Sequence, residues 1–449
     1  MITPRTLKGF RDYLPSLMMP REHLLACARR VYRSYGYAPI DTPALEFTEI
    51  LLGKGGDESD KQMYRFRHAD DEVALRFDLT VPFARFAAQH LHTLGTPFKR
   101  YHMGPVWRGE NTQRGRYREF WQCDFDTIGT TSNAADIETA LVIHDLMVAL
   151  GVQQFEIRLN NRLILNGLLA TLGLADRAAV LLRCLDKLGK VEADKVAAEM
   201  VQKAQVTLEQ AQQVLGLSQL SGSNDEMLDR LQAEYGEQPQ TAEGIARLRE
   251  LLGAAQEAGI PEARLRLDLS IARGLDYYTG TIYETFLLGE FVDQDGQTKQ
   301  LSSFGSVCSG GRYDNLAALY TKTPLPGVGA SLGLDRLLSV LDVMNLLPQV
   351  STPAPVLIVQ MEPVIGLYQG MARQLRAAGV GVEVYPEAKK IGTQLAYADR
   401  KGFRVALIAG SRELAEGVWN VKDLTRKQEI RTADVLGTVR QILGEVQPV

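Results

Sequence analysis

The sequence is poor in the features that mark membrane, secreted and nucleic-acid-wrapping proteins. No stretch approaches the ~18 consecutive apolar residues of a membrane-spanning helix. The N-terminal run MITPRTLKGFRDYLP lacks the apolar segment of a signal peptide. The net charge over 449 residues is only -4. We therefore expect no membrane partner. We also expect that the protein does not bind nucleic acid through a positive charge spread over its whole surface.

Cysteine is also scarce, and its placement excludes a disulfide framework. The four cysteines lie far apart and form no CxxC pair. Such cysteines are typical of free thiols in a reducing compartment rather than of a zinc site. The six histidines likewise show no metal-ligand spacing. We expect a cytoplasmic protein without a protein-bound structural metal. The cysteines are Cys27, Cys123, Cys184 and Cys308.

Composition indicates an ordinary globular protein with an uneven charge distribution. Hydrophobic residues form 45% of the chain and charged residues 23%. At ~100–200 residues per domain, the length predicts two or three domains. Residues 355–449 hold 13 Lys and Arg against 10 Asp and Glu, whereas the rest holds 37 against 44. A basic C-terminal unit that contacts phosphate explains this asymmetry, and chance variation explains it equally well.

The N-terminal third mixes helical and strand patterns. The run PREHLLACARRVYRSYGY repeats apolar residues at helical spacing, and EVALRFDLTVP alternates as a strand does. FKRYHMGPVWR and REFWQCDFDTIG then predict two strands joined by the polar loop RGENTQRGRY. Strand patterns resume over residues 264–340. These patterns predict an antiparallel sheet flanked by helices.

Two other segments differ from this core. Residues 167–260 are rich in Ala, Leu, Gln and Glu at helical spacing, which predicts a helical insertion. The core would therefore consist of residues 1–166 and 261–345. After the linker-like run LLPQVSTPAP, strands and helices alternate over residues 355–449. This alternation predicts a small α/β domain with a largely parallel sheet.

Three segments carry residues suited to chemistry, and each also has a purely structural explanation. GVGASLGLDR fits neither a dinucleotide-binding nor a Walker pattern, so close strand–helix packing accounts for it. ARGLDYYTG sets one arginine, one acid and two tyrosines beside a glycine turn, yet a hairpin corner needs no more than that. Five arginines near RGENTQRGRY either form a solvated hairpin or bind phosphate oxygens. They are Arg100, Arg108, Arg114, Arg116 and Arg118.

Taken together and in this order, the segments resemble class II aminoacyl-tRNA synthetases, and over nearly the whole chain the histidyl-tRNA synthetase family. Motif 1 of that class resembles the first helix plus YAPIDTPALE, with Pro43 as its proline. Motif 2 resembles MGPVWRGENTQRGRYREFWQCDFDTIG, and motif 3 resembles GVGASLGLDRLL. The two peptides peculiar to the histidyl family resemble ARGLDYYTGTIYE and SGGRYDNL. Five matches in the right order are highly specific, whereas any one alone is not.

The resemblance implies a fold and an activity. The fold is α+β, with an antiparallel-sheet catalytic core, a helical insertion and a C-terminal α/β anticodon-binding domain. The activity is ATP-dependent activation of L-histidine to histidyl-adenylate, followed by transfer to tRNA(His). The implied partners are tRNA(His), histidine, ATP with Mg²⁺, and a second copy of the chain, because motif 1 usually forms the two-fold interface.

The motifs imply catalytic roles for a set of charged residues. Arg108 of motif 2 would clamp the α-phosphate and the substrate carboxylate, with Arg273 facing it across that phosphate. Arg336 of motif 3 would hold the γ-phosphate, assisted by Arg116 at the β/γ end. Glu110 would contact the adenine or a metal-linked water. Fixed positive charge suits this reaction because negative charge grows on the phosphoryl oxygens.

A second set of residues is implied to recognise histidine. Asp126 and Tyr278 would hold the imidazole ring, while Asp78, Thr80 and Gln122 would hold the ammonium group. A site built from polar partners rejects analogues that lack the matching groups, because its own groups are then left unpaired. The full set is Asp78, Leu79, Thr80, Arg108, Gln122, Asp126, Arg273, Tyr277 and Tyr278.

Two residues depart from the common bacterial pattern. Asp78 and Asp126 stand where many bacterial members have glutamate, and resemble the eukaryote-like form of the family. Shorter carboxylates require pocket walls that sit closer. The alternative function is that of a non-catalytic relative, the histidine-sensing regulatory subunit of ATP phosphoribosyltransferase. That relative normally lacks the C-terminal domain and has eroded ATP motifs. The intact motifs also disfavour a purely RNA-binding protein.

Overall fold

The computed structural model describes residues 1–449 except 53–56, 189–190, 273–276, 294, 348–351 and 445–449. The chain forms two compact units. One consists of Met1–Arg11 and His23–Leu346, and the other of Asp12–Glu22 and Leu347–Val449. Within the described residues, no helix is both long enough and apolar enough to span a bilayer.

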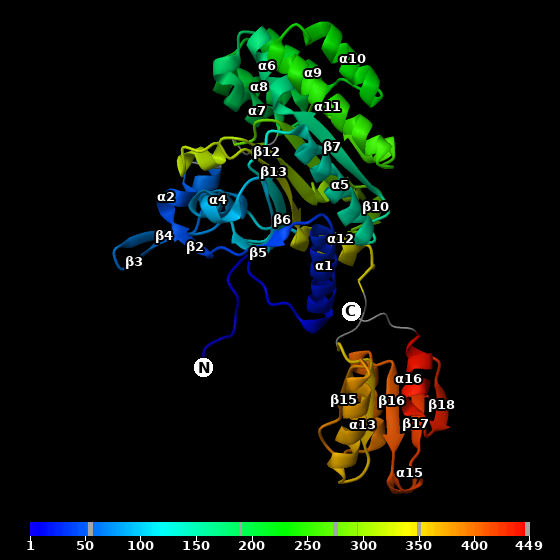
Figure 1. Ribbon diagram of the computed structural model, residues 1–449. Coiled ribbons are helices and arrows are strands. Elements are labelled where there is room, and N and C mark those ends of the chain that lie inside the picture. The colour runs from blue at the N-terminus through cyan, green and yellow to red at the C-terminus, as the bar shows by residue number, and fades with distance from the viewer. Residues whose placement is uncertain (53–56, 189–190, 273–276, 294, 348–351, 445–449) are drawn as a thin grey trace. The chain divides into compact units, whose positions relative to one another are not determined.

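The larger unit is built on an eight-stranded sheet with the order β1-β5-β6-β13-β12-β9-β7-β8 (Figure 1). Only the edge pairs β1–β5 and β7–β8 are parallel. The predicted antiparallel core is therefore confirmed, and the strands of motifs 2 and 3, β6 and β13, are neighbours. The strands are β1 (Ala38–Pro39), β5 (Phe98–Trp107), β6 (Glu119–Ile128), β7 (Phe155–Asn161), β8 (Leu265–Leu267), β9 (Thr281–Leu287), β12 (Cys308–Tyr313) and β13 (Gly327–Gly333).

The apolar face of β6 packs against α1 (Pro15–Ser34), which begins five residues before the expected Pro20. The ring of Tyr32 lies 5.0 Å from that of Phe125, and its hydroxyl donates to the carbonyl of Cys123 at 2.9 Å. Because side chains alternate along a strand, the even-numbered residues of β6 point to the opposite face. That face carries the candidate site.

Further elements surround the sheet. A three-stranded antiparallel sheet has the order β2-β4-β3. It consists of β2 (Leu45–Phe47), β4 (Asp71–Leu75) and β3 (Arg65–His68), with α2 (Thr48–Leu51), α3 (Asp57–Gln62) and α4 (Thr80–Leu94) nearby in sequence. The remaining elements outside the helical insertion are α5 (Asn133–Ala149), η2 (Glu262–Arg264), β10 (Glu290–Val292), β11 (Thr298–Gln300), η3 (Leu301–Phe304), η4 (Leu316–Leu319) and α12 (Leu334–Val343).

In the segment predicted as a helical insertion, drawn green in Figure 1, every element formed by the described residues is a helix. Leu181, Val196, Met200 and Val214 are buried together in one hydrophobic cluster, to which the core segment after the insertion contributes Ala272. The first helix begins at Arg162, so the division at residue 167 stays a prediction. The elements are α6 (Arg162–Thr171), η1 (Ala175–Arg177), α7 (Ala178–Leu185), α8 (Ala193–Ala204), α9 (Leu208–Ser218), α10 (Asn224–Tyr235) and α11 (Pro239–Glu257).

The smaller unit contains a five-stranded sheet with the order β15-β14-β16-β17-β18. The first three strands are parallel, as the βα alternation predicts, whereas β17 and β18 add an antiparallel edge. The sequence patterns did not predict these two strands. The elements are β14 (Val356–Gln360), α13 (Ile365–Ala377), β15 (Val382–Val384), α14 (Ile391–Lys401), β16 (Val405–Ala409), α15 (Ser411–Glu416), β17 (Trp419–Asp423), β18 (Gln428–Thr432) and α16 (Val435–Leu443).

Candidate functional site

A row of polar side chains crosses one face of the large sheet. Gln122, Asp124 and Asp126 alternate along β6 and so share that face. Opposite them on β5, Arg100 pairs in register with Asp126, and His102 pairs with Asp124. Directly opposite residues of antiparallel strands lie side by side, so the register alone gathers three acceptors and a cation.

Glycines on the neighbouring strands leave room above this row. A Cβ atom on Gly329 of β13 would lie 2.4 Å from Oδ1 of Asp126. A Cβ atom on Gly311 of β12 would lie 2.7 Å from the ring of Tyr278. Only glycine at these two positions therefore lets the Asp126 carboxylate and the Tyr278 ring lie this close to the neighbouring backbone.

Arg100 is a buried cation beneath the carboxylates. Its side chain is fully buried, with Nη2 2.6 Å from Asp126 and 3.8 Å from Asp124. The ring of Phe83 from α4 covers the guanidinium at 4.4 Å. The explanation of the arginine-rich hairpin as solvated is therefore wrong for Arg100. Sequence reasoning missed its role, although its alternation with Tyr101 along a strand placed it on the face opposite that residue.

Asp126 is held from two sides. Tyr313 at the end of β12 donates its hydroxyl hydrogen to Oδ1 of Asp126 at 2.6 Å. Burial raises the pKa of Asp126, while Arg100 and Tyr313 oppose the rise. Burial also raises the pKa of Asp124 to about 7, again against Arg100. Tyr313 lies in one of the two peptides peculiar to the histidyl family, but only the structure pairs it with Asp126.

The start of α4 brings the next predicted residues to the same place. Oδ1 of Asp78 accepts from the backbone N–H of Val81 at 3.0 Å, in the first turn of the helix that Thr80 begins. Leu79 is buried, and its carbonyl accepts from Arg100 at 3.3 Å. Burial raises the pKa of Asp78, and the hydrogen bond to Val81 opposes this.

The paired tyrosines complete the cluster. The rings of Tyr277 and Tyr278 are 5.0 Å apart, and Tyr277 lies 6.1 Å from Tyr313. Burial raises the pKa of Tyr277 well above its usual value, as does the nearby Asp78, while a hydrogen bond with Thr80 opposes the rise. The structure thus brings together most of the residues implied to recognise histidine.

Several buried polar atoms of this cluster have no hydrogen-bond partner within the described residues. They include Oδ2 of Asp78, Oε1 of Gln122, Oδ1 of Asp124, Oδ2 of Asp126, and Nε and Nη1 of Arg100. Nε2 of Gln122 already donates to Ser331 at 2.8 Å, which leaves its oxygen to accept. An unpaired buried polar group costs ~1–3 kcal/mol, so a site dominated by acceptors calls for a ligand rich in N–H donors.

Arg108 follows β5 and is oriented by its neighbours. Its Nε donates to the carbonyl of Phe77 at 2.9 Å. Its guanidinium lies 5.1 Å from the ring centroid of Phe120 and 5.8 Å from that of Phe77. Aromatic rings hold a guanidinium plane without using up its terminal donors. Because Phe77 precedes Asp78, this arginine is tied to the edge of the acidic cluster.

The other predicted ATP-binding residues lie on the hairpin loop and on α12. Glu110 and Arg116 form an ion pair at 3.5 Å. Arg336 donates to the carbonyl of Ser306. A Cβ atom on Gly115 would lie 3.7 Å from Cα of Arg336, so the loop passes close to the start of α12.

Arg11, which sequence reasoning did not single out, connects the hairpin loop to α12. It pairs with Asp335 at 3.0 Å and donates to the hydroxyl of Tyr117 at 2.9 Å. Arg273 falls outside the described residues. The predicted convergence of Arg108, Arg273 and Arg336 on one cavity therefore stays a prediction. Among the described residues, no group of three His, Cys, Asp or Glu side chains is placed to hold a metal ion.

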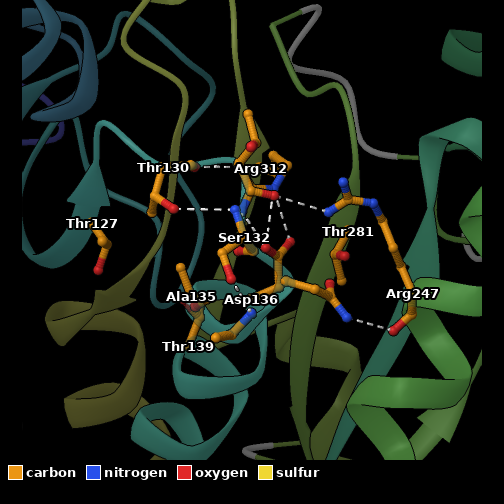
Figure 2. A network of polar contacts seen from close by, with 12 residues as sticks. Thr127, Thr130, Ser132, Ala135, Asp136, Thr139, Arg247, Thr281 and Arg312 are labelled. Atoms are coloured by element: carbon orange, nitrogen blue, oxygen red, sulfur yellow. Dashed lines mark hydrogen bonds and ion pairs between the residues drawn. The ribbon is translucent and has the colours of Figure 1, made fainter. Parts of the chain in front are cut away.

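A second buried cation fixes the end of β12 (Figure 2). The side chain of Arg312 donates to both carboxylate oxygens of Asp136, to the carbonyls of Thr130 and Ser132, and to Asp314. Five donors are available on a guanidinium, and these acceptors occupy all three of its nitrogens. Arg312 therefore holds the strand end in place rather than binding a ligand.

Comparisons of this chain with known proteins, by sequence and by structure, agree on one family. The family model described as histidyl-tRNA synthetase matches residues 9–337, and an anticodon-binding-domain model matches residues 355–442. The histidine–tRNA ligase of Rhodopirellula baltica is 56% identical over 95% of this chain and 95% of its own length. The crystal structure of histidyl-tRNA synthetase from a Nostoc species is 35% identical, with a TM-score of 0.85 over 98% of this chain and 100% of that one.

The fold is also shared with a protein that carries the alternative function in its name. A structure from Bacillus halodurans, described as an ATP phosphoribosyltransferase regulatory subunit/histidyl-tRNA synthetase, has a TM-score of 0.71. It is 21% identical and covers 88% of this chain and 97% of its own. At that identity the likeness shows the fold alone.

The Arg312 network generates a prediction about stability. Asp136 is fully buried, so Asp136→Asn leaves Arg312 without its buried charged partner and should cost about 3–5 kcal/mol of unfolding free energy. The matched control, Asp314→Asn, removes a carboxylate that is 33% exposed and should cost less than about 1 kcal/mol. Denaturant unfolding of both variants measures the difference. Equal losses would contradict the assignment of Asp136 as the dominant partner.

Proposed function

The chain belongs to the histidyl-tRNA synthetase family, and from this we propose that the acidic face of its large sheet binds histidine for activation by ATP. The protein is a histidine–tRNA ligase of class II. It joins L-histidine to tRNA(His) in two steps, through a histidyl-adenylate. The single observation that carries the site is the buried group of acceptors on β6 and at the start of α4, which lack partners among the described residues.

In the first step, a carboxylate oxygen of histidine attacks the α-phosphorus of ATP, and the bond to pyrophosphate breaks. Arg108 would bind the α-phosphate and the substrate carboxylate, with Arg273 opposite it. Arg336 and Arg116 would hold the β/γ end, and Glu110 the adenine side. Mg²⁺ accompanying ATP would supply positive charge at the phosphates, and Glu110 is the residue that would reach a metal-linked water. The chain itself supplies orientation and fixed positive charge.

Recognition of the side chain falls to Asp126 and Tyr278. An imidazole N–H is a good hydrogen-bond donor to a carboxylate. The ion pair with Arg100 and the hydrogen bond from Tyr313 hold the Asp126 carboxylate in position. Asp78, Thr80 and Gln122 would surround the ammonium group, and Leu79 and Tyr277 would line the pocket. An amino acid of similar size without ring nitrogens leaves Asp126 unpaired and is rejected for that reason.

Histidine-dependent exchange of pyrophosphate into ATP tests both the activity and this assignment. The natural chain should catalyse it, because activation is reversible. Asp126→Asn should lower kcat/KM for histidine by ~30-fold or more, since a charged hydrogen bond lost at the transition state costs roughly 2–4 kcal/mol. The KM for ATP should change little and serves as the internal control. Histidine kinetics within a few-fold of the parent would remove the ring-reading role from Asp126.

In the second step, the activated histidine is transferred to the terminal ribose of tRNA(His). The smaller unit, which matches the anticodon-binding model, would bind nucleotides of the tRNA other than the terminal one that reacts. Its positive balance, 13 basic against 10 acidic residues over 355–449, supports contact with phosphate. Binding energy supplied away from the chemistry chiefly lowers KM.

A chain ending at Leu347 separates the two steps. It retains every residue proposed for ATP and histidine, so pyrophosphate exchange should survive once folding is verified by circular dichroism. Aminoacylation should fail mainly through a raised KM for tRNA. Unchanged aminoacylation at low tRNA concentration would refute the anticodon role. Loss of exchange in a folded protein would mean that residues beyond 347 complete the active site.

We also propose a homodimer formed through the motif 1 region. Besides the resemblance, an exposed apolar row supports it. Phe47 of β2 pairs with Val73 of β4, which pairs with Phe66 of β3, so the three side chains share a face. Phe47 is 53% exposed and Phe66 47% exposed. Such a row on a sheet next to Pro43 is a surface that a second copy can bury.

The variant Phe47→Glu tests the dimer. A charge buried at the interface should shift the protein to monomers in sedimentation velocity. Val148→Glu is the control, because Val148 is equally exposed at 52% but lies on α5. The proposal is wrong if the natural chain sediments as a monomer, or if both variants dissociate alike.

A further inference from the structure

The carboxylate of Asp124 has no role in the function proposed so far. It lies on β6 midway between Gln122 and Asp126, which are assigned to the two ends of the histidine molecule. A strand rises about 3.4 Å per residue, so each of these neighbours lies about 7 Å from it along the strand. Asp124 therefore sits below the middle of any ligand that spans both.

The neighbours of Asp124 do not satisfy both of its carboxylate oxygens. Arg100 lies closer to Asp126, at 2.6 Å, than to Asp124, at 3.8 Å. A hydrogen bond with Ser331 engages one side of the Asp124 carboxylate. Its Oδ1 is buried and has no partner among the described residues, and the residue as a whole is only 1% exposed.

The unpaired acceptors of this face match an ammonium group in number. Oδ2 of Asp126 is set aside because it lies 2.6 Å from Arg100. Three further carboxylate or amide oxygens are then left over: Oδ2 of Asp78, Oε1 of Gln122 and Oδ1 of Asp124. An alkylammonium group presents three N–H donors in a fixed geometry. The hydroxyl of Thr80, the other residue implied to hold this group, is already engaged with Tyr277.

The charge around Asp124 suits a cation as well. Asp78 and Asp126 both act on it electrostatically, and Arg100 is the cation that opposes them. Burial raises the pKa of Asp124 to about 7, so near neutral pH it can become an anion when a positive ligand arrives. A neutral or anionic ligand group at this point would leave the acidic cluster uncompensated.

We propose that Asp124 is a further substrate-binding residue, whose carboxylate accepts a hydrogen bond from the α-ammonium of histidine together with Asp78 and Gln122. This inference rests on the proposed function and deepens it. Asp126 reads the ring, and Asp124 reads the amino group. The site therefore selects an intact α-amino acid, and an imidazole compound without the amino group loses this contact.

The variant Asp124→Asn tests the proposal in the full-length chain. It keeps the size of the side chain and removes the charge. The KM for histidine in pyrophosphate exchange should rise about ten-fold or more, as the loss of a charged hydrogen bond implies. The KM for ATP should stay within about two-fold. A KM for histidine within about two-fold of the parent, or an equal rise in both KM values, would overturn the proposal.

Two inhibitors locate the lost contact. L-Histidinol keeps the ring and the ammonium group, whereas 3-(imidazol-4-yl)propionate keeps the ring and lacks the ammonium. Asp124→Asn should weaken inhibition by histidinol and leave inhibition by the propionate unchanged. Asp126→Asn, the matched contrast on the same strand face, should weaken both. Equal weakening of both inhibitors by Asp124→Asn would assign Asp124 a structural role instead.

Two controls keep the outcomes separate. Thermal unfolding of Asp124→Asn should match or exceed that of the parent, because the change removes a buried charge. If the variant does not fold, Asp124→Ser provides the same comparison with a smaller hydroxyl side chain. The natural chain is measured first, since absence of histidine-dependent exchange there would refute the proposed function and not the placement of Asp124 alone.

Discussion

The buried guanidinium of Arg100 is the interaction on which the substrate face depends. Asp78, Asp124 and Asp126 are all buried on one side of the sheet, and burial alone raises the pKa of each. The guanidinium beneath them, 2.6 Å from Asp126, opposes this rise in the pKa of all three. Breaking a buried pair by removing one partner is strongly destabilising, so the register of β5 with β6 is a constraint on the whole site.

A second buried cation has a different task. Arg312 uses its donors on Asp136 and on nearby carbonyls, and so anchors the end of β12 rather than binding a ligand. Its chain neighbour Tyr313 can then reach Asp126. Together with Gly329, where a Cβ atom would collide with the Asp126 carboxylate, this anchor sets the orientation of Asp126, the acid proposed to read the ring. Orientation by a supporting residue, rather than flexibility, is what a discriminating polar pocket requires.

The arrangement of the substrate site lowers the stability of the protein without ligand. Buried acceptors without partners and a carboxyl group with a pKa near 7 are unfavourable in a closed fold. A ligand that brings three N–H donors and a positive charge relieves both. Polar groups of this kind are conspicuous because most buried polar atoms in folded proteins are paired. The activation of a cationic, ring-bearing amino acid accounts for the same features that packing alone leaves unexplained.

Much of this follows from the sequence by itself. The two-residue period of a strand determined that Gln122, Asp124 and Asp126 share a face. The order of the motifs indicated the family, the strand patterns indicated the antiparallel core, and the alternation of strands and helices indicated the α/β C-terminal unit. The tertiary structure alone decided that Arg100 is buried rather than solvated, and that Arg312 meets Asp136, 176 positions away. It also decided which acceptors remain unpaired. Local patterns encode which side a residue faces, whereas partners and burial depend on the register and packing of strands that are distant in the chain.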